Sequence, residues 1–584
     1  MTAVSSPTPQ NAPASPHHPF AEQVSQWLSQ YPRWRIMVYA MASFIIGMTQ
    51  GLGINLVASN LPGIQGSLGI TATESYWLVA AYTATSISGT LLLYKVRTQF
   101  GIRRFGEYGL LFFAAVSLAQ VFTHDFQTAV AVRAVMGFAM ASLGPLAIFY
   151  MFEIFPPAKK LTAGLCLGLA GSQIALPISR IISPYLLDLG HWHQLAFLES
   201  GLALICLAII WVLPLTHPPR VKVFERIDWL SYPLIGIAIA CISVVLTMGR
   251  YYWWFEKPWL GEVLVVGIVT LTLAFMVELK RKNPIIDLRW LMTPEMLMFT
   301  GSMLFVRMLL SEQTTGMVGF LTLVGLQNDQ LITLFWVVLV MTFAGLVFIS
   351  IIHKSERIVY IHLFAMLLIA GGAWMDAHST IDTHPEQFYL SQGMIAFAGA
   401  IFLPTALWLG FVRALQFGQS QIISFILVFL STQNIGAQLG SAFLGTIQIL
   451  REKFHSSVMT DSIQLQNPLI AERVAHYRQA LKAALGDDVQ LQAQSLARLI
   501  PSRPGFWPTT MCLWWCFIWR WAASPCCCCI AGWPVFTLKR TRRIHEEYFS
   551  LSVDFGCAVS GHRWRFCCAL QLAAFPLHLK GGNH

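Results

Sequence analysis

A few ionisable side chains stand inside long apolar stretches of this 584-residue chain. On insertion scales, an ionisable residue at the centre of a bilayer costs about 2.5–3.5 kcal/mol, so each is a functional-site hypothesis by default. The candidates are Arg133, Arg180, Glu199, Arg307 and Glu312. A buried carboxyl group can carry a proton, and a buried arginine favours an anionic substrate.

Each candidate also has a structural alternative, which the sequence leaves open. Arg133 could hydrogen-bond backbone carbonyls and only hold helices together, and Glu199 or Glu312 could lie in water or headgroups at a helix end. Arg413 is close enough to a helix end to reach the interface, so we discount it. Five further carboxylates lie near predicted helix ends, where boundary error alone could place them among headgroups: Glu74, Glu107, Glu262, Glu278 and Asp376.

The composition indicates an all-α polytopic membrane protein. Hydrophobic residues make up 55% of the chain and charged residues 11%, whereas a soluble globular protein carries about 25% charged residues. Apolar runs of about 20 residues recur, which is the length an α-helix needs to cross the hydrocarbon core. The ten-residue alternating segments of a membrane β-barrel are absent.

We expect about 14 transmembrane helices, each spanning about 20 apolar residues. The predicted spans are 36–58, 74–95, 105–123, 127–151, 162–187, 194–215, 229–249, 258–278, 297–320, 334–352, 358–376, 389–412, 420–447 and 507–536.

Positive charge tests this count. Clusters of Lys and Arg follow spans two, four, six, eight and ten, whereas the linkers after spans one, three, five, nine and eleven carry none. Only Arg250 and Lys257, between spans seven and eight, blur the alternation. This positive-inside pattern predicts a bacterial inner-membrane protein with both termini in the cytoplasm. It also accounts for the net charge of +10 without nucleic acid.

Several motifs lie at matching places in this arrangement. They are AVAVRAVMGFAMA in span four, with Arg133 and Gly137; NLVASNLPGIQGSLG and YWLVAAYTA around the start of span two; RTQFGIRRF after it, with Gly101, Arg103 and Arg104; EIFPPAKKLTAGL after span four; and SQIALPISRIISP in span five, with Pro177. Together, over about residues 35–500, they resemble the major facilitator superfamily, and in particular its fourteen-span drug/proton antiporter branch.

The resemblance implies two six-helix bundles with two central helices, which alternate access to a site near the bilayer midplane. It implies proton coupling through the motif of Arg133 and Gly137. It also implies conformational roles for Gly137, Gly101, Arg103, Arg104 and Pro177. The expected segments are a flexible tail (1–34), the N-terminal bundle (35–215), a linker with two central helices (216–290), C-terminal bundle helices (291–451), a periplasmic loop (452–505), an aberrant last span (506–538) and an unstructured tail (539–584).

Some positions depart from the family pattern. The acidic residue of span one falls at Gly53, and that of the basic loop falls at Thr98. The Gly-Pro pair expected in span five reads Leu176-Pro177, and Arg180 stands where a small residue is usual. These losses put proton antiport in question or move the proton site to Glu199 or Glu312.

The sequence changes character after about Pro501. Nine of the 12 cysteines lie from Cys512 onward, including Cys526 to Cys529. Four consecutive cysteines cannot all bind one tetrahedral ion, so a zinc site fits poorly. Back-translation of 504–534 one base upstream permits an ordinary apolar span. We therefore hypothesise a frameshift near 498–503, which resequencing of the DNA tests.

The leading interpretation is an exporter of small amphiphilic or anionic organic compounds, coupled to protons. By the resemblance, 452–505 would dock a membrane-fusion adaptor and an outer-membrane channel. An importer of organic anions and a membrane-embedded sensor or enzyme stay as alternatives. No P-loop, cofactor motif or metal set is present in the sequence, so we expect neither a cofactor nor a catalytic site.

Overall fold

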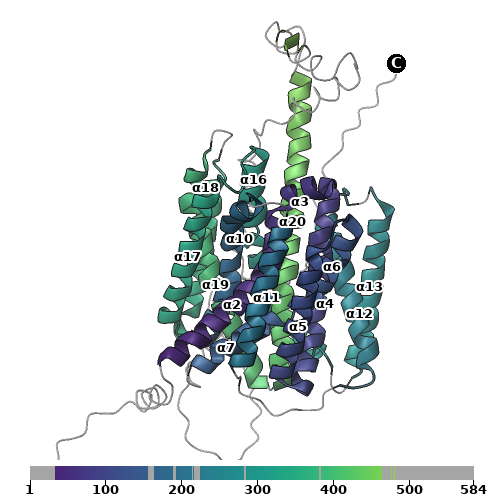
Figure 1. The fold of residues 1–584 in the computed structure, drawn as a ribbon, viewed down its shortest axis with the longest axis vertical. Coiled ribbons are helices and arrows are strands. Elements are labelled where there is room, and N and C mark those ends of the chain that lie inside the picture. The colour runs from purple at the N-terminus through teal and green to yellow at the C-terminus, as the bar shows by residue number, and fades with distance from the viewer. Residues whose placement is uncertain are drawn as a thin grey trace, which may run out of the picture. The chain divides into compact units, whose positions relative to one another are not determined.

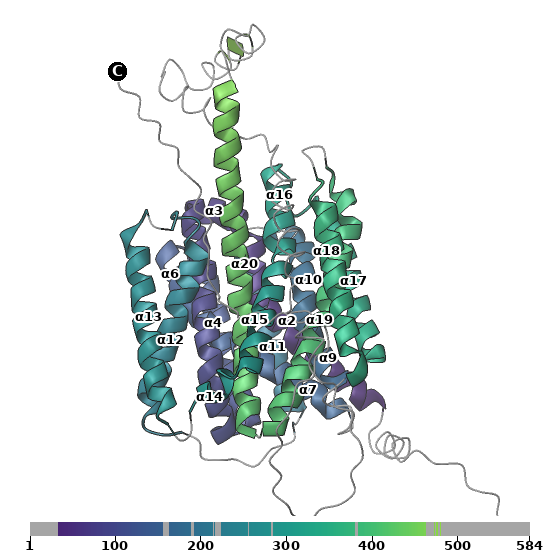
Figure 2. The ribbon, with the colours of Figure 1, turned by 180° about the vertical axis from the view of Figure 1, so that it is seen from behind.

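The fold is seen in a computed structural model of the chain. It describes residues 33–479, with gaps at 156–162, 189–191, 214, 216–223, 255, 282–283, 380–382 and 418 and through most of 463–479. Within these residues every element is a helix, and the helices pack side by side as a bundle (Figures 1 and 2).

The first six predicted spans coincide with helices. They are α2 (Arg33–Ser59), α4 (Ala72–Phe100), α5 (Ile102–Val121), α6 (Phe126–Met140) with α7 (Leu143–Ile154), α9 (Leu165–Gly168) with α10 (Ala170–Asp188), and α11 (His193–Val212). The short α3 (Leu61–Leu68) follows α2. Span four, predicted as one helix, is interrupted by a turn at Ala141 and Ser142.

The later spans also coincide with helices. They are α12 (Asp228–Met248), α13 (Pro258–Leu279), α15 (Pro294–Leu310) continued by the π-helical turn η2 (Glu312–Met317) and α16 (Val318–Leu323), α17 (Ile332–Ile352), α18 (Ile358–Asp376), α19 (Tyr389–Phe417) and α20 (Gln419–Ser462). The short α14 (Leu288–Leu291) precedes α15, and the 3₁₀ turn η4 (Pro385–Phe388) precedes α19. The fourteenth predicted span lies outside the described residues.

Nine helical segments in the described part of the chain are long and apolar enough to cross a membrane. The segments of α4, α5, α15 to α16, and α20 are not among the nine, and they lie in the same bundle (Figure 1). Polar side chains are buried along two of them, for example Thr83 in α4 and Gln438 in α20. A polar stripe of this kind lowers mean hydropathy without exposing the helix to water.

The two largest groups of buried apolar side chains lie mainly on different helices. One includes Phe113, Met140 and Ile210, from α5, α6 and α11. The other includes Phe299 and Phe402, from α15 and α19. At one side of the bundle α12 packs against α4, and α13 packs against α12 (Figure 2). Only 17% of the most apolar window of α13 is buried. Its bare apolar surface is what a lipid-facing helix requires.

Helix α20 is longer than the sequence predicted. Its 44 residues correspond to about 66 Å at 1.5 Å per residue, roughly twice the hydrocarbon thickness. It continues past the ends of its neighbours (Figure 1). The prediction that a loop begins at 452 is therefore wrong, because residues 452–462 extend the helix.

Candidate functional site

Arg133 is a fully enclosed side chain in the middle of the bundle. Asp125 is the N-terminal cap of helix α6, and its side chain accepts a hydrogen bond from the Thr128 amide at 3.1 Å. This carboxylate cap fixes the start of the helix. Two turns on, Arg133 is 1% exposed. Its Nη2 donates to the Gly53 carbonyl at 2.8 Å, and its guanidinium carbon lies 4.5 Å from the centre of the Tyr82 ring.

The family pattern expects an acidic residue at position 53, and this contact shows what takes its place. The acceptor for the Arg133 hydrogen bond is the backbone carbonyl oxygen of Gly53 in α2, and not an acidic side chain. A Cβ at Gly53 would lie 2.1 Å from the Met140 Cε atom and 2.9 Å from the Tyr82 hydroxyl. The space is therefore filled by the side chains of Met140 and Tyr82.

Glu199 is the acidic neighbour of Arg133. It comes from α11 and is 2% exposed. Its Oε1 lies 3.8 Å from Arg133 Nη1, which is within ion-pair range and too long for a hydrogen bond. Neither oxygen of Glu199 has a hydrogen-bond partner in the described part of the chain. The sequence named both residues separately, and the fold brings them together as a loosely held pair.

Gly137 explains why α6 can approach α4 closely. A Cβ at this position would lie 2.2 Å from the Tyr82 carbonyl oxygen and 2.4 Å from Thr85 Oγ1. Small residues allow helix backbones to approach in this way. Gly137 therefore allows α6 to lie close enough to α4 for Arg133 to contact the Tyr82 ring.

Gly101 joins α4 to α5. Its φ of +91° lies in a region that residues with a Cβ rarely adopt, so the turn between these helices requires glycine. Arg103 pairs with Glu107 one helical turn away, at 2.9 Å, and Arg104 is exposed. Pro177 is buried inside α10. The contacts described for Gly101, Arg103, Arg104 and Pro177 are local to their own helices and turns. None of these contacts involves Arg133.

Glu312 lies in η2 and is 4% exposed. Gln392 of α19 donates from Nε2 to Glu312 Oε2 at 3.1 Å and to Asp376 Oδ2 at 2.7 Å. Asp376 is 2% exposed at the last residue of α18. The sequence left open whether Asp376 lies among headgroups, and the fold buries it within the protein beside a second carboxyl group.

Arg180 and Arg307 occupy other places. Arg180 donates from Nη1 to Asn328 Oδ1 at 2.7 Å, and Asn328 in turn donates to the Ser59 carbonyl at 2.9 Å. Arg307 donates from Nε to the Gln433 carbonyl at 3.2 Å. No carboxylate of the described residues lies within ion-pair distance of either arginine.

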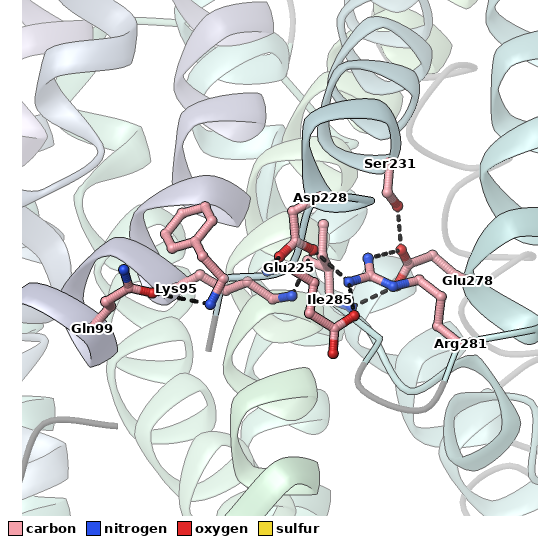
Figure 3. A network of polar contacts seen from close by, with 9 residues as sticks. Lys95, Gln99, Glu225, Asp228, Ser231, Glu278, Arg281 and Ile285 are labelled. Atoms are coloured by element: carbon pink, nitrogen blue, oxygen red, sulfur yellow. Dashed lines mark hydrogen bonds and ion pairs between the residues drawn. The ribbon is translucent and has the colours of Figure 1, made fainter. Parts of the chain in front are cut away.

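A second charged group lies where α4 and α13 end and α12 begins (Figure 3). The sequence analysis counted its lysine and arginine only as linker charge. We call Lys95, Glu225, Asp228, Glu278 and Arg281 the basic-end cluster. Lys95 Nζ and Arg281 Nη2 each lie 2.6 Å from Asp228 Oδ1. Arg281 also reaches Glu278 Oε1 at 2.8 Å and Glu225 Oε2 at 3.1 Å. The cluster thus ties both central helices to α4.

We expect Arg281→Gln to lower the thermal unfolding midpoint of the purified protein, because Glu278, whose side chain is 1% exposed, loses its cation. Removing one partner of a buried ion pair costs about 3–5 kcal/mol. Glu295→Gln is the control. Glu295 pairs with Arg413, but its side chain is 65% exposed, and exposed ion pairs contribute about 0–1 kcal/mol to stability. Equal midpoints for the two variants would contradict the assignment.

Comparison with known proteins identifies the fold. A family model described as Major Facilitator Superfamily matches residues 40–447. The chain matches a solved POT family transporter with a TM-score of 0.50 and 14% identity, over 70% of this chain and 90% of that one.

Relatives in curated collections are distant. FarB, a fatty acid resistance protein of Neisseria gonorrhoeae, is 25% identical over 269 residues, which is 44% of this chain and 51% of that protein. Multidrug resistance protein 3 of Bacillus subtilis is 24% identical over 237 residues, 40% of this chain and 44% of that protein. The multidrug export protein EmrB of Escherichia coli is 22% identical over 254 residues, 44% and 49%. The chain thus spans about half the length of the curated relatives it matches.

These names agree with the predicted drug-exporter branch, and the helices agree with the predicted all-α membrane fold. The family comprises multi-pass membrane transporters of small molecules, and its model covers most of the described helices. The chain therefore belongs to the Major Facilitator Superfamily.

Proposed function

We propose that this protein is a secondary active exporter of small amphiphilic organic compounds, anionic ones included, driven by proton influx. The observation that carries the proposal is the buried pair of Arg133 and Glu199. Arg133 Nη1 lies 3.8 Å from Glu199 Oε1, and the carboxylate accepts no hydrogen bond from any residue that the structure describes. A charge pair held this loosely inside a membrane bundle can be broken and remade as the acid gains and loses a proton. The names of the relatives support export of drugs and fatty acids.

The direct test uses an efflux-deficient bacterial host that expresses the full chain beside a frame-corrected version. We expect lower accumulation of at least one amphiphilic dye or organic acid, and we expect an ionophore that collapses the proton gradient to abolish the difference. Unchanged accumulation across cationic, neutral and anionic compounds would contradict the proposal.

An anionic substrate class has its own support. Arg180 is 8% exposed and bonds to a neutral amide, and Arg307 bonds to a backbone carbonyl. Both therefore keep a positive charge without a described carboxylate partner, and such a charge attracts anions more strongly than it would in water.

We expect Arg180→Gln and Arg307→Gln to reduce export of the anion carboxyfluorescein by about tenfold, about 1.4 kcal/mol, and to change export of the cation ethidium little. Arg413→Gln is the matched control, because it removes the same kind of charge from an arginine that already pairs with a carboxylate, the exposed Glu295. If both arginine variants export carboxyfluorescein at the wild-type rate, the anionic class loses its basis.

We also propose that the protein lies in the inner membrane with both termini in the cytoplasm. The alternation of basic linkers supports this orientation. Under it, α20 extends on the periplasmic side, and with residues 452–505 it would meet a membrane-fusion adaptor. Cysteine labelling from outside intact spheroplasts tests it: Ser457→Cys should react and Ser355→Cys should not, and the opposite pattern would reverse the orientation.

A further inference from the structure

Two buried carboxyl groups share one amide in the second half of the chain. Glu312, Asp376 and Gln392 come from η2, α18 and α19, and their exposed fractions are 4%, 2% and 0%. The Gln392 amide has one nitrogen, and it lies 3.1 Å from Glu312 Oε2 and 2.7 Å from Asp376 Oδ2. Each acid therefore receives one of the two N–H groups.

The charges around this pair leave it uncompensated. No described Lys, Arg or His lies within ion-pair distance of either acid. Arg307, the nearest arginine in sequence to Glu312, is bonded to the Gln433 carbonyl. Two like charges that share a desolvated site cannot both ionise, so one of the two groups keeps a proton.

One oxygen of the pair, Oε1 of Glu312, accepts no hydrogen bond from the residues that the structure describes. The same atom is buried. A carboxylate oxygen without a donor is poorly stabilised as an anion, so this oxygen is where we expect a proton to bind.

The backbone around Glu312 is shaped to hold it. Residues Glu312–Met317 form a π-helical turn between α15 and α16, and isolated π turns are frequent at functional sites. A Cβ at Gly316 would lie 3.1 Å from Glu312 Oε1, so glycine leaves room for the carboxyl group to fold back against its own helix.

We propose that Glu312 and Asp376 form a second proton-binding site, separate from Arg133 and Glu199, with Gln392 as its positioning residue. The proposal rests on the proposed proton-driven export, for which this pair would carry a coupling proton. With one proton the pair is a monoanion. A second proton from water forms a new carboxyl O–H bond and makes it neutral, and release to water on the other side of the membrane breaks that bond.

The test is an infrared pH titration of the purified full chain, which follows the carbonyl stretch of protonated carboxylic acids. We expect wild-type protein to keep this band at neutral pH and each of Glu312→Gln and Asp376→Asn to change its titration. The variant with both substitutions should lose the part of the band that these two acids contribute, while the contribution of Glu199 remains. Gln392→Met keeps both acids and should shift the titration without abolishing it. Glu386→Gln, at an exposed carboxylate in η4, is the control.

The outcomes separate this inference from the proposed function. If the wild-type chain shows proton-driven export of ethidium or carboxyfluorescein and all variants titrate like wild type, the second site is wrong and the function stands. If the titrations differ as expected and no probe is exported, the function is wrong and proton binding by the pair stands.

Discussion

Glu199→Gln is expected to abolish uphill export while leaving downhill exchange of substrate largely intact. Glutamine keeps the size of the side chain and cannot carry a proton, so the substrate can still cross and the gradient can no longer drive it. Reconstituted vesicles measure both rates. We expect gradient-driven transport to fall by about a hundredfold, about 2.8 kcal/mol, and exchange to change by less than about threefold.

Arg133 supplies the control for this result. Arg133→Gln leaves Glu199 as a buried carboxylate without a cation, because Glu199 forms no second ion pair with the residues that the structure describes. Losing one partner of a buried pair costs about 3–5 kcal/mol. The double variant, Arg133→Gln with Glu199→Gln, removes both charges. It should therefore be more thermally stable than Arg133→Gln alone and still fail in uphill transport. If Glu199→Gln transports uphill at the wild-type rate, this pair does not couple.

Gly137→Ala is expected to damage the fold itself. The new methyl group would lie 2.2 Å from a backbone oxygen of α4, and backbone cannot rotate away as a flexible side chain can. Forcing a methyl group into a packed contact costs about 1–3 kcal/mol, so α6 and α4 must separate and Tyr82 must leave Arg133.

The measurement is the yield of monodisperse protein in detergent and its thermal unfolding midpoint. Gly201→Ala is the matched control, since it changes the same residue type in another helix and its Cβ would meet nothing within 4 Å. We expect a marked loss for Gly137→Ala and none for Gly201→Ala. Equal behaviour would show that close approach at Gly137 is unimportant.

The sequence predicted the helices well because one physical requirement governs them. A backbone in hydrocarbon must satisfy its own hydrogen bonds, so each apolar run of sufficient length becomes a helix. The linker charges then supported the count. Features that depend on a few backbone angles were missed, namely the turn at Ala141 and Ser142 and the π turn from Glu312 to Met317.

The site residues were predicted in part. Arg133, Glu199 and Glu312 were found because charge within an apolar run is conspicuous in a sequence. The two neighbours of Glu312 were not among the candidates, because Gln392 is uncharged and Asp376, which lies at the last residue of its helix, was set aside as a helix-end carboxylate. A side chain near a helix end is buried or wet according to its neighbours from other helices, which a single sequence does not reveal.

The basic-end cluster was missed for a related reason. Lys95 and Arg281 were counted as positive charges of cytoplasmic linkers, and they also neutralise Asp228 and Glu278. A charge pattern gives the number and sign of the side chains in a linker. It does not give the acidic side chain that each one meets across helices separated by 133 residues, as Lys95 and Asp228 are.

Proton movement that depends on substrate tests the central claim most directly. Vesicles containing the full chain and an internal pH-sensitive dye are given an outward gradient of carboxyfluorescein or ethidium. We predict that substrate flux drives protons in the opposite direction, and that Glu199→Gln removes this proton flux while substrate still crosses. Substrate flux in the wild-type chain with no proton movement, and at a rate indifferent to an imposed pH gradient, would contradict proton-driven export.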